Sequence, residues 1–324
     1  MKRRASLIAG LSLAAITSLP TVVLAQGKYP DRAIKITVGF PAGSSTDAAT
    51  RLVATKLSQV LEQSVVVENR PGASSTLAAK AVAGLEPDGY NLFVVTIANA
   101  INANAPGAMA FDVVKNFSPI AMLGRVPNVL VVPAALEVSS LDQLITLLKS
   151  KPGQFNFASS GNGTAPHLAG VLFGKLAGVE VLHVPYKGSS EAMADLVAGR
   201  VSMMFSPAST VLPHIRSGKL KALASIGQSR SPIVPDLPAI SELGLKDFES
   251  SVWFGLVAPL NTPADVQATL AQAVETALDS PEVSKQFTLQ GIEVVKAGPQ
   301  EFGQYIRTET EKWGKVMGRA PDSN

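Results

Sequence analysis

Residues 40–47 read FPAGSSTD and separate two stretches of different pattern. Before them, residues 34–38 (IKITV) form a short apolar run that predicts a β-strand. After them, apolar residues recur at three- and four-residue spacing from Ala49 to Leu61, which predicts a helix. A small-residue turn at a helix start leaves backbone N–H groups unpaired at the positive end of the helix dipole. We therefore expect a carboxylate to bind at this turn.

The same pattern recurs in the second half of the chain. Residues 155–164 (FNFASSGNGT) again join an apolar run to a helical pattern through small residues. In each half, a second strand, a small-residue loop, a helix and a third strand are predicted to follow, at 65–95 and 181–205. The fold class is therefore α/β, with two βαβαβ halves whose loops lie at the carboxyl ends of the strands. Two such halves facing each other enclose a cleft.

The first turn also has a purely structural interpretation. Ser, Thr and Asp before a helix are ordinary N-cap residues, and only the repetition favours a binding site. Asp47 can equally satisfy the start of its helix, because its charge would repel a carboxylate ligand. Thr96 and Asn99 follow the strand predicted at 92–95 and are further candidates for the cleft wall.

The first 25 residues have the pattern of a cleaved secretory signal peptide. They begin with three basic residues, continue with an apolar stretch and end in VLA, so we expect cleavage after Ala25. The whole chain has 28 basic and 25 acidic residues, and removing this segment leaves 25 of each. The basic balance thus belongs to the leader and predicts neither nucleic-acid nor membrane-surface binding. The chain has no Cys, which excludes a lipid anchor on cysteine.

The order of the predicted elements indicates two domains. The chain changes pattern near residues 126–128 and returns after a segment at 219–224. We predict a first domain of 26–125 plus 225–324 and a second domain of 126–224. Two crossings between domains are typical of a hinge.

Other chemistry has weak support. The three His residues have no metal-binding spacing and no Cys beside them, so neither a metal nor a cofactor is predicted. His167 lies in the first turn of the second-half helix and either faces the cleft or is a solvated side chain, and Tyr186 is a further wall candidate. A secreted hydrolase remains an alternative, although no GxSxG motif is present.

Several short motifs together resemble one family. They are residues 29–32 (YPDR), 40–43 (FPAG), 65–73 (VVVENRPGA), 87–90 (PDGY), 184–188 (VPYKG) and 253–256 (WFGL). On these motifs the chain resembles the Bug family, the extracytoplasmic receptors of tripartite tricarboxylate transporters. The resemblance covers essentially the whole chain after the leader.

This resemblance implies a two-domain periplasmic binding protein, type II-like, that closes on a carboxylate in the cleft. Two loops would hold one carboxylate through backbone amides and hydroxyls, which avoid the desolvation cost of a buried Lys or Arg. With the candidates above, the predicted ligand-binding residues are Phe40, Ala42, Gly43, Ser44, Asp47, Thr96, Asn99, Ser159, Ser160, Asn162, Gly163, Thr164, His167, Tyr186 and Ser206.

The chain departs from the family pattern at three places. The family usually has a second Gly at the position of Ser44 and a Gly-Gly-Asn run at residues 74–76, which read SST here. It often has an Asp at the position of Ser206. An Asp there could pair with a ligand ammonium, so this chain is predicted to prefer a carboxylate without a positive group.

The predicted function is that of a periplasmic receptor for a mono-, di- or tricarboxylate, aromatic acids included. Its expected partners are the ligand and the membrane permease subunits of a tripartite transporter, and the receptor itself is expected to be a monomer. A receptor that reports to a membrane sensor would have the same fold and remains an alternative.

Overall fold

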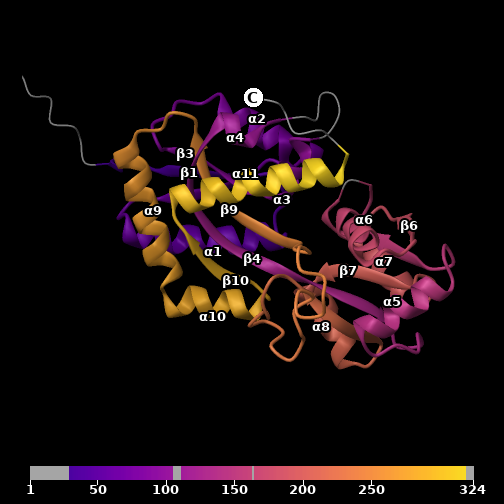
Figure 1. Ribbon diagram of the computed structural model, residues 1–324. Coiled ribbons are helices and arrows are strands. Elements are labelled where there is room, and N and C mark those ends of the chain that lie inside the picture. Colours follow the sequence, from indigo (N-terminus) through magenta and orange to yellow (C-terminus); the bar gives the residue numbers. More distant parts are fainter. Residues whose placement is uncertain (1–28, 105–110, 163, 319–324) are drawn as a thin grey trace, which may run out of the picture.

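The computed structural model describes residues 29–104, 111–162 and 164–318 (Figure 1). The predicted signal peptide with its cleavage site, and Gly163 of the predicted site, lie outside these residues. The strands are β1 (Ile34–Val38), β2 (Val65–Asn69), β3 (Asn91–Thr96), β4 (Phe117–Pro133), β5 (Asn156–Ser159), β6 (Leu182–Pro185), β7 (Met203–Pro207), β8 (Leu220–Ile226), β9 (Ser251–Pro259) and β10 (Glu293–Ala297). The helices are α1 (Ser45–Val60), α2 (Thr76–Ala83), α3 (Ile97–Asn102), α4 (Val113–Asn116), α5 (Leu141–Ser150), α6 (Ala165–Ala177), α7 (Ser189–Val197), α8 (Ala208–Arg216), α9 (Ala264–Leu278), α10 (Pro281–Leu289) and α11 (Pro299–Val316).

The predicted repeat is present in the strand order. In the first half, β1 pairs in parallel with β2 and β3, and in the second half β5 pairs in parallel with β6 and β7. Both halves therefore have the order second, first, third strand. Parallel strands need a crossover connection, and the helices at the predicted positions supply it. The α/β fold class is confirmed.

Strand β4 is shared by both halves. Its first part, up to Pro127, pairs antiparallel with β9, and its last part, from Asn128, pairs antiparallel with β7 and β8. The sequence predicted only the last part, because Pro119, Gly124 and Pro127 resemble strand breakers. Register shifts in the pairing with β9, near Pro119 and Gly124, allow these residues to remain within the strand.

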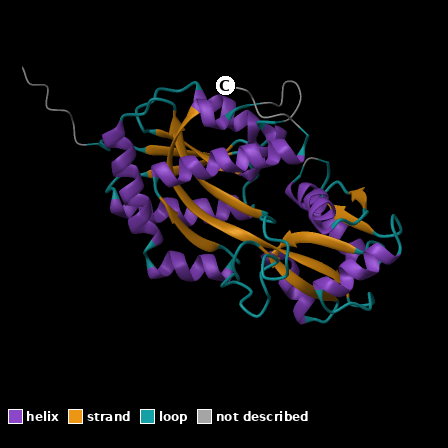
Figure 2. Ribbon diagram, viewed as in Figure 1, coloured by secondary structure: helices purple, strands orange, loops and turns teal. Residues whose placement is uncertain are grey.

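We call the two ends of this arrangement the first lobe and the second lobe. The first lobe contains β1, β2, β3, β9, β10 and β4 up to Pro127, and the second contains β5 to β8 and the rest of β4. Helices cover both faces of the strands in each lobe (Figure 2). In the first lobe, α1, α9 and α10 pack on one face and α2, α3 and α11 on the other. In the second lobe, α5 and α6 lie opposite α7 and α8.

The segment between β8 and β9 packs on the second lobe. Ile240 and Phe248 are fully buried in the same apolar cluster as Leu130, Phe173 and Phe205. The predicted domain boundary assigned this segment to the first domain. Its apolar side chains instead lie in the second-lobe core, so the chain leaves that lobe only as β9 begins. None of the described helices combines the length and the apolar content needed to span a bilayer.

Candidate carboxylate-binding site

The turn between β1 and α1 is built as a helix start with unpaired donors. Ser44 is the N-cap of α1, and its hydroxyl accepts the N–H of Asp47 at 3.3 Å. Gly43 has a φ of +81°, a conformation that costs a residue with a side chain about 1–2 kcal/mol. The N–H groups of Ser45 and Thr46 have no intrahelical acceptor. The turn can therefore donate hydrogen bonds to an anion at the positive end of α1.

Asp47 stabilises this turn from inside. Asp47 is 2% exposed, and its carboxylate accepts the N–H of Gly43 at 2.8 Å, the amide of Asn69 at 2.8 Å and the guanidinium of Arg51 at 3.0 Å. Burial would raise the pKa of Asp47, but the hydrogen bonds from Arg51, Gly43 and Asn69 outweigh it and keep the pKa below its usual value. The carboxylate points into this network, where Arg51 offsets its charge. This matches the structural role that the sequence left open for Asp47.

Asn69 ties the turn to the neighbouring strand. Besides Asp47, its amide donates to the carbonyl of Phe40 at 3.1 Å, and its side-chain oxygen accepts from Arg51 at 2.8 Å. Neither Asn69 nor Arg51 was predicted from the sequence to belong to the site. The only available signals were the position of Asn69 at the end of a strand and the four-residue spacing of Asp47 and Arg51 on one helix face.

The corner between β3 and α3 lies beside the turn. Because β1 and β3 are parallel neighbours, with Val38 opposite Val94, their carboxyl ends lie at the same edge. The side-chain oxygen of Asn99 accepts the N–H of Thr96 at 2.9 Å, and both residues are buried. Thr96 and Asn99 thus start α3.

The loop before α2 is the most strained part of this edge. Residues Ala73, Ser74 and Ser75 all have positive φ, and the amide of Asn102 donates to the carbonyl of Ser74 at 3.0 Å. Three consecutive residues in this conformation are rare and need support from their surroundings. Two of these residues, Ser74 and Ser75, belong to the 74–76 departure from the family pattern.

In the second lobe, the loop before α6 folds around Gly161. The N–H of Gly161 donates to the Ser159 hydroxyl at 3.1 Å, and the Thr164 hydroxyl donates to the carbonyl of Gly161 at 2.7 Å. Ser159 is fully buried, Ser160 and Thr164 are partly exposed, and Asn162 is exposed. Ser160, Asn162 and the start of α6 are therefore the parts of this loop that a ligand can reach.

Two histidines, His183 and His167, pack beside this loop. The Ser159 hydroxyl and His183 Nε2 form a hydrogen bond of 2.6 Å. The His183 ring stacks on Phe157 and lies tilted against His167, with centroid distances of 4.9 and 4.1 Å. Burial, together with the neighbouring His167, lowers the pKa of His183 to about 4. Burial also lowers the pKa of His167. Both rings are therefore neutral near pH 7.

A Ser–His pair also occurs in hydrolases, so this contact bears on the hydrolase alternative. Ser159 is 0% exposed, and in the part of the chain that the structure describes no carboxylate is hydrogen-bonded to His183. A nucleophile must reach its substrate, and its base must be oriented by a third group. The Ser159–His183 pair meets neither condition and serves to hold the loop.

Tyr186 and Ser206 lie at the same edge of the second-lobe sheet. Tyr186 donates its N–H to the Ser159 carbonyl at 3.0 Å and its hydroxyl to Asp195 at 2.7 Å. Ser206 is fully buried in β7, opposite Val129, and its hydroxyl has no partner among the described residues. The Tyr186 side chain is thus engaged within its own lobe.

The two lobes meet through α3 and α6. Ala165 and Leu168 of α6 belong to the same apolar cluster as Ile97, Ala100 and Ile101 of α3. The contact brings the start of α6, which carries His167, next to α3, which begins at the corner of Thr96 and Asn99. Within the described ranges, no hydrogen bond joins the β1–α1 turn to residues 159–162.

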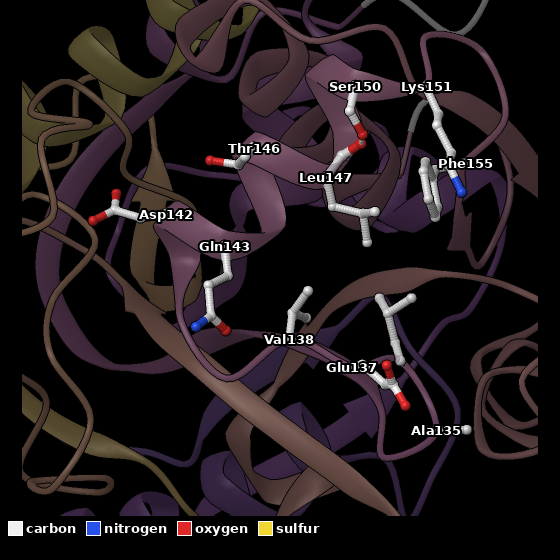
Figure 3. A pocket seen from close by; sticks show the side chains of 11 residues that line it. Ala135, Glu137, Val138, Asp142, Gln143, Thr146, Leu147, Ser150, Lys151 and Phe155 are labelled. Atoms are coloured by element: carbon white, nitrogen blue, oxygen red, sulfur yellow. Dashed lines mark hydrogen bonds between the residues drawn. The ribbon is translucent and has the colours of Figure 1, made fainter.

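A separate hollow of about 780 Å³ lies on the second lobe beside α5 (Figure 3). Leu147, Val138 and Phe155 border it, and none of the predicted site residues line it. It is formed by one lobe alone, so a ligand there would not contact both. Among residues 29–104, 111–162 and 164–318, no group of three His, Asp or Glu side chains is arranged to hold a metal.

Two α/β lobes that share strand β4 and present helix-starting loops at the carboxyl ends of parallel strands define a periplasmic-binding-protein fold. Residues 49–320 match the family model described as the tripartite tricarboxylate transporter family receptor. The chain belongs to this family, as the motifs of the sequence indicated. The family and its solved relatives are solute-binding receptors of the periplasm rather than enzymes.

Individual relatives cover most of the chain. Protein BugT of Bordetella pertussis is 36% identical over 291 residues, which are 89% of each chain. A solved structure of an R. palustris protein with adipate is 32% identical, with a TM-score of 0.75, over 90% of this chain and 99% of that one. MatC from Rhodopseudomonas palustris with bound malate is 32% identical, with a TM-score of 0.72, over 89% and 99%.

Proposed function

We propose that this receptor binds a small carboxylate between its two lobes and delivers it to the permease subunits of a tripartite transporter. The observation that carries the proposal is the β1–α1 turn, where Arg51 offsets the charge of Asp47 and the first N–H groups of α1 remain free of intrahelical acceptors. An anion at such a turn gains hydrogen bonds and a favourable dipole. The adipate and malate bound by its relatives support the carboxylate class.

The proposed contacts are those exposed at the edges of both lobes. In the first lobe they are Phe40, Ala42, Gly43 and Ser44, with Thr96 and Asn99 shaping the wall. In the second lobe they are Ser160, Asn162, Thr164 and His167, with Ser159, Tyr186 and Ser206 behind them. Gly163, which lies outside the described residues, is proposed as a contact from the sequence alone. A ligand that contacts both lobes only when they approach shifts the population toward the closed form. Asp47 then acts as a positioning residue.

We propose two domains. The first contains residues 26–125 and the part of the chain after the second crossing, and the second runs from residue 126 to that crossing. The burial of Ile240 and Phe248 in the second lobe supports a second crossing at 249–251 rather than at 224–225. We also propose export by a signal peptide cleaved after Ala25 and a monomeric receptor. N-terminal sequencing of the exported protein and light scattering measure these two properties.

The test is thermal unfolding of residues 26–324 with malate, adipate, citrate, benzoate and the matching amides. A ligand at one hundred times its dissociation constant adds about 2.7 kcal/mol, which raises the unfolding midpoint by several degrees. We expect one carboxylate class to raise the midpoint and its amides to leave it unchanged. Stabilisation by the amides as well, or by none of the panel, would overturn the carboxylate assignment.

A paired variant locates the site. Gly43→Leu should abolish the ligand-induced shift, because its side chain occupies the turn where the anion is proposed to bind. Gly199→Leu is the matched control, since Gly199 has a similar φ of +74° and open space around it, in the second lobe after α7. Both variants should lose comparable stability, and only Gly43→Leu should lose binding.

A further inference from the structure

Helix α6 belongs to the second lobe and also contacts the first. Its residues Ala169, Phe173 and Ala177 are buried in the second-lobe core. Near its start, Ala165 and Leu168 are instead buried with apolar residues of α3 and α11, and Leu168 is only 4% exposed. The side chain of Leu168 is therefore shielded from water through the other lobe.

The far end of α6 makes a polar contact with the same lobe. Lys175 Nζ donates to the carbonyl of Val316 at 3.2 Å. Val316 is the last residue of α11, where the carbonyls have no intrahelical donor and the helix dipole favours a positive charge. This hydrogen bond joins the two lobes away from the segment 227–250.

Both contacts lie apart from the two crossing segments. The lobes are joined covalently at β4, near Pro127 and Asn128, and by the segment before β9. Figure 1 shows α6 and the end of α11 on the upper side, with the crossings below them. A small rotation about the crossings would separate these contacts, which therefore report on closure. Neither contact needs a ligand.

We propose that α6 holds the two lobes together in the free receptor, with Leu168 as the apolar contact and Lys175 as the polar one. The open form would expose Leu168 and leave the Val316 carbonyl to water. Because apparent affinity scales with the fraction of competent protein, closing contacts made without ligand raise affinity and slow dissociation. The effect on affinity rests on the function proposed above, whereas the effect on the free receptor does not.

The test measures the distance between the lobes without ligand. The chain has no Cys, so spin labels can be attached at Gln59→Cys on α1 and Glu191→Cys on α7, both exposed. Pulsed electron paramagnetic resonance of the free receptor should give one dominant short distance. Lys175→Ala should increase the population with the longer distance about two- to tenfold, the range of one hydrogen bond. Leu168→Ala should increase it at least about tenfold.

One control and the choice of test variants separate closure from folding. Leu176→Ala changes an exposed leucine on the same helix and should leave the distances unchanged. Lys175 is exposed, so Lys175→Ala keeps the test decisive even if Leu168→Ala unfolds the receptor. Identical distance distributions for the wild-type receptor and for Lys175→Ala would overturn the proposal, as would a free wild-type receptor that is already open.

The second measurement of this experiment is the binding of malate or adipate to each variant. The dissociation constant of each variant should rise by the same factor by which its closed population falls. A weaker affinity with unchanged distances would show that α6 acts on the binding loop, which would also overturn the proposal. If neither acid binds, the proposed carboxylate class fails, and the distance measurement on the free receptor still decides the role of α6.

Discussion

The Asp47 carboxylate accepts the backbone N–H of Gly43 across 2.8 Å and so closes the turn that opens α1. Side chains from two elements hold that carboxylate, Arg51 from α1 and Asn69 from β2. An acid that was expected to repel an anionic ligand is thus part of the scaffold that positions the turn. Its charge is offset within the first lobe before any ligand arrives.

Replacing Asp47 should therefore weaken both the fold and the site. Asp47→Ala removes hydrogen bonds to a charged group and should lower the free energy of unfolding by about 2–3 kcal/mol. Urea unfolding measures this loss, and calorimetry with the acid that binds best should show reduced affinity. Asp142→Ala is the control, because Asp142 is an exposed acid in the first turn of α5. Equal losses for both variants would contradict the role assigned to Asp47.

A second prediction concerns Gly39 and Ser75, which lie close together at the carboxyl ends of β1 and β2. A Cβ at Gly39 would lie 1.9 Å from the Ser75 hydroxyl, so Gly39→Ala should cost about 1–3 kcal/mol through overpacking. Ser75 has a φ of +73° and a buried hydroxyl without a partner among the described residues, so Ser75→Gly relieves the strain and removes the two nearest atoms, while its Cα stays 2.7 Å from the new Cβ. Urea unfolding of the double variant should show part of the loss recovered. Additive effects would contradict this contact.

The histidine stack predicts a fall in stability on acidification. The pKa of His183 is about 4 in the folded chain and near 6.5 when unfolded, so the unfolded state takes up more protons between these values. The free energy of unfolding should decrease as pH falls from about 6.5 to about 4, and His183→Phe should reduce this slope. The shift of the Asp47 pKa acts at lower pH, below 3.8. A His183 ring that titrates near 6.5 by NMR would contradict the prediction.

A fourth prediction concerns Glu309 and can be followed by tryptophan fluorescence. Its buried carboxylate accepts the indole N–H of Trp253 at 2.9 Å and of Trp313 at 3.2 Å, and these are the only two tryptophans of the chain. Glu309→Ala should cost about 2–3 kcal/mol, because two buried donors lose their acceptor and Lys312 loses one of its two acceptors. Tryptophan emission should shift at the same time. Glu311→Ala, at an exposed position of the same helix, should change neither property.

The sequence was informative where structure depends on local pattern. The strand at 34–38, the helix from Ser45 and the second copy of both elements were predicted from apolar periodicity, and the structure confirms them. The same turn residues also indicated where a ligand would bind, because helix starts depend on neighbouring residues. Short motifs indicated the receptor family. These features are encoded within a few residues of one another.

Contacts between distant residues left no such signal. The first part of β4 looked broken by Pro and Gly, yet pairing with β9 stabilises it as a strand. Asp47 with Asn69, Ser159 with His183, and α6 with α3 and α11 are brought together only by the packing of whole elements. By itself the sequence determined the family, the repeat and the turns. The tertiary structure decided which polar groups already have hydrogen-bond partners within the protein and which helix joins the lobes. Burial and the choice of partner depend on residues far apart in the chain.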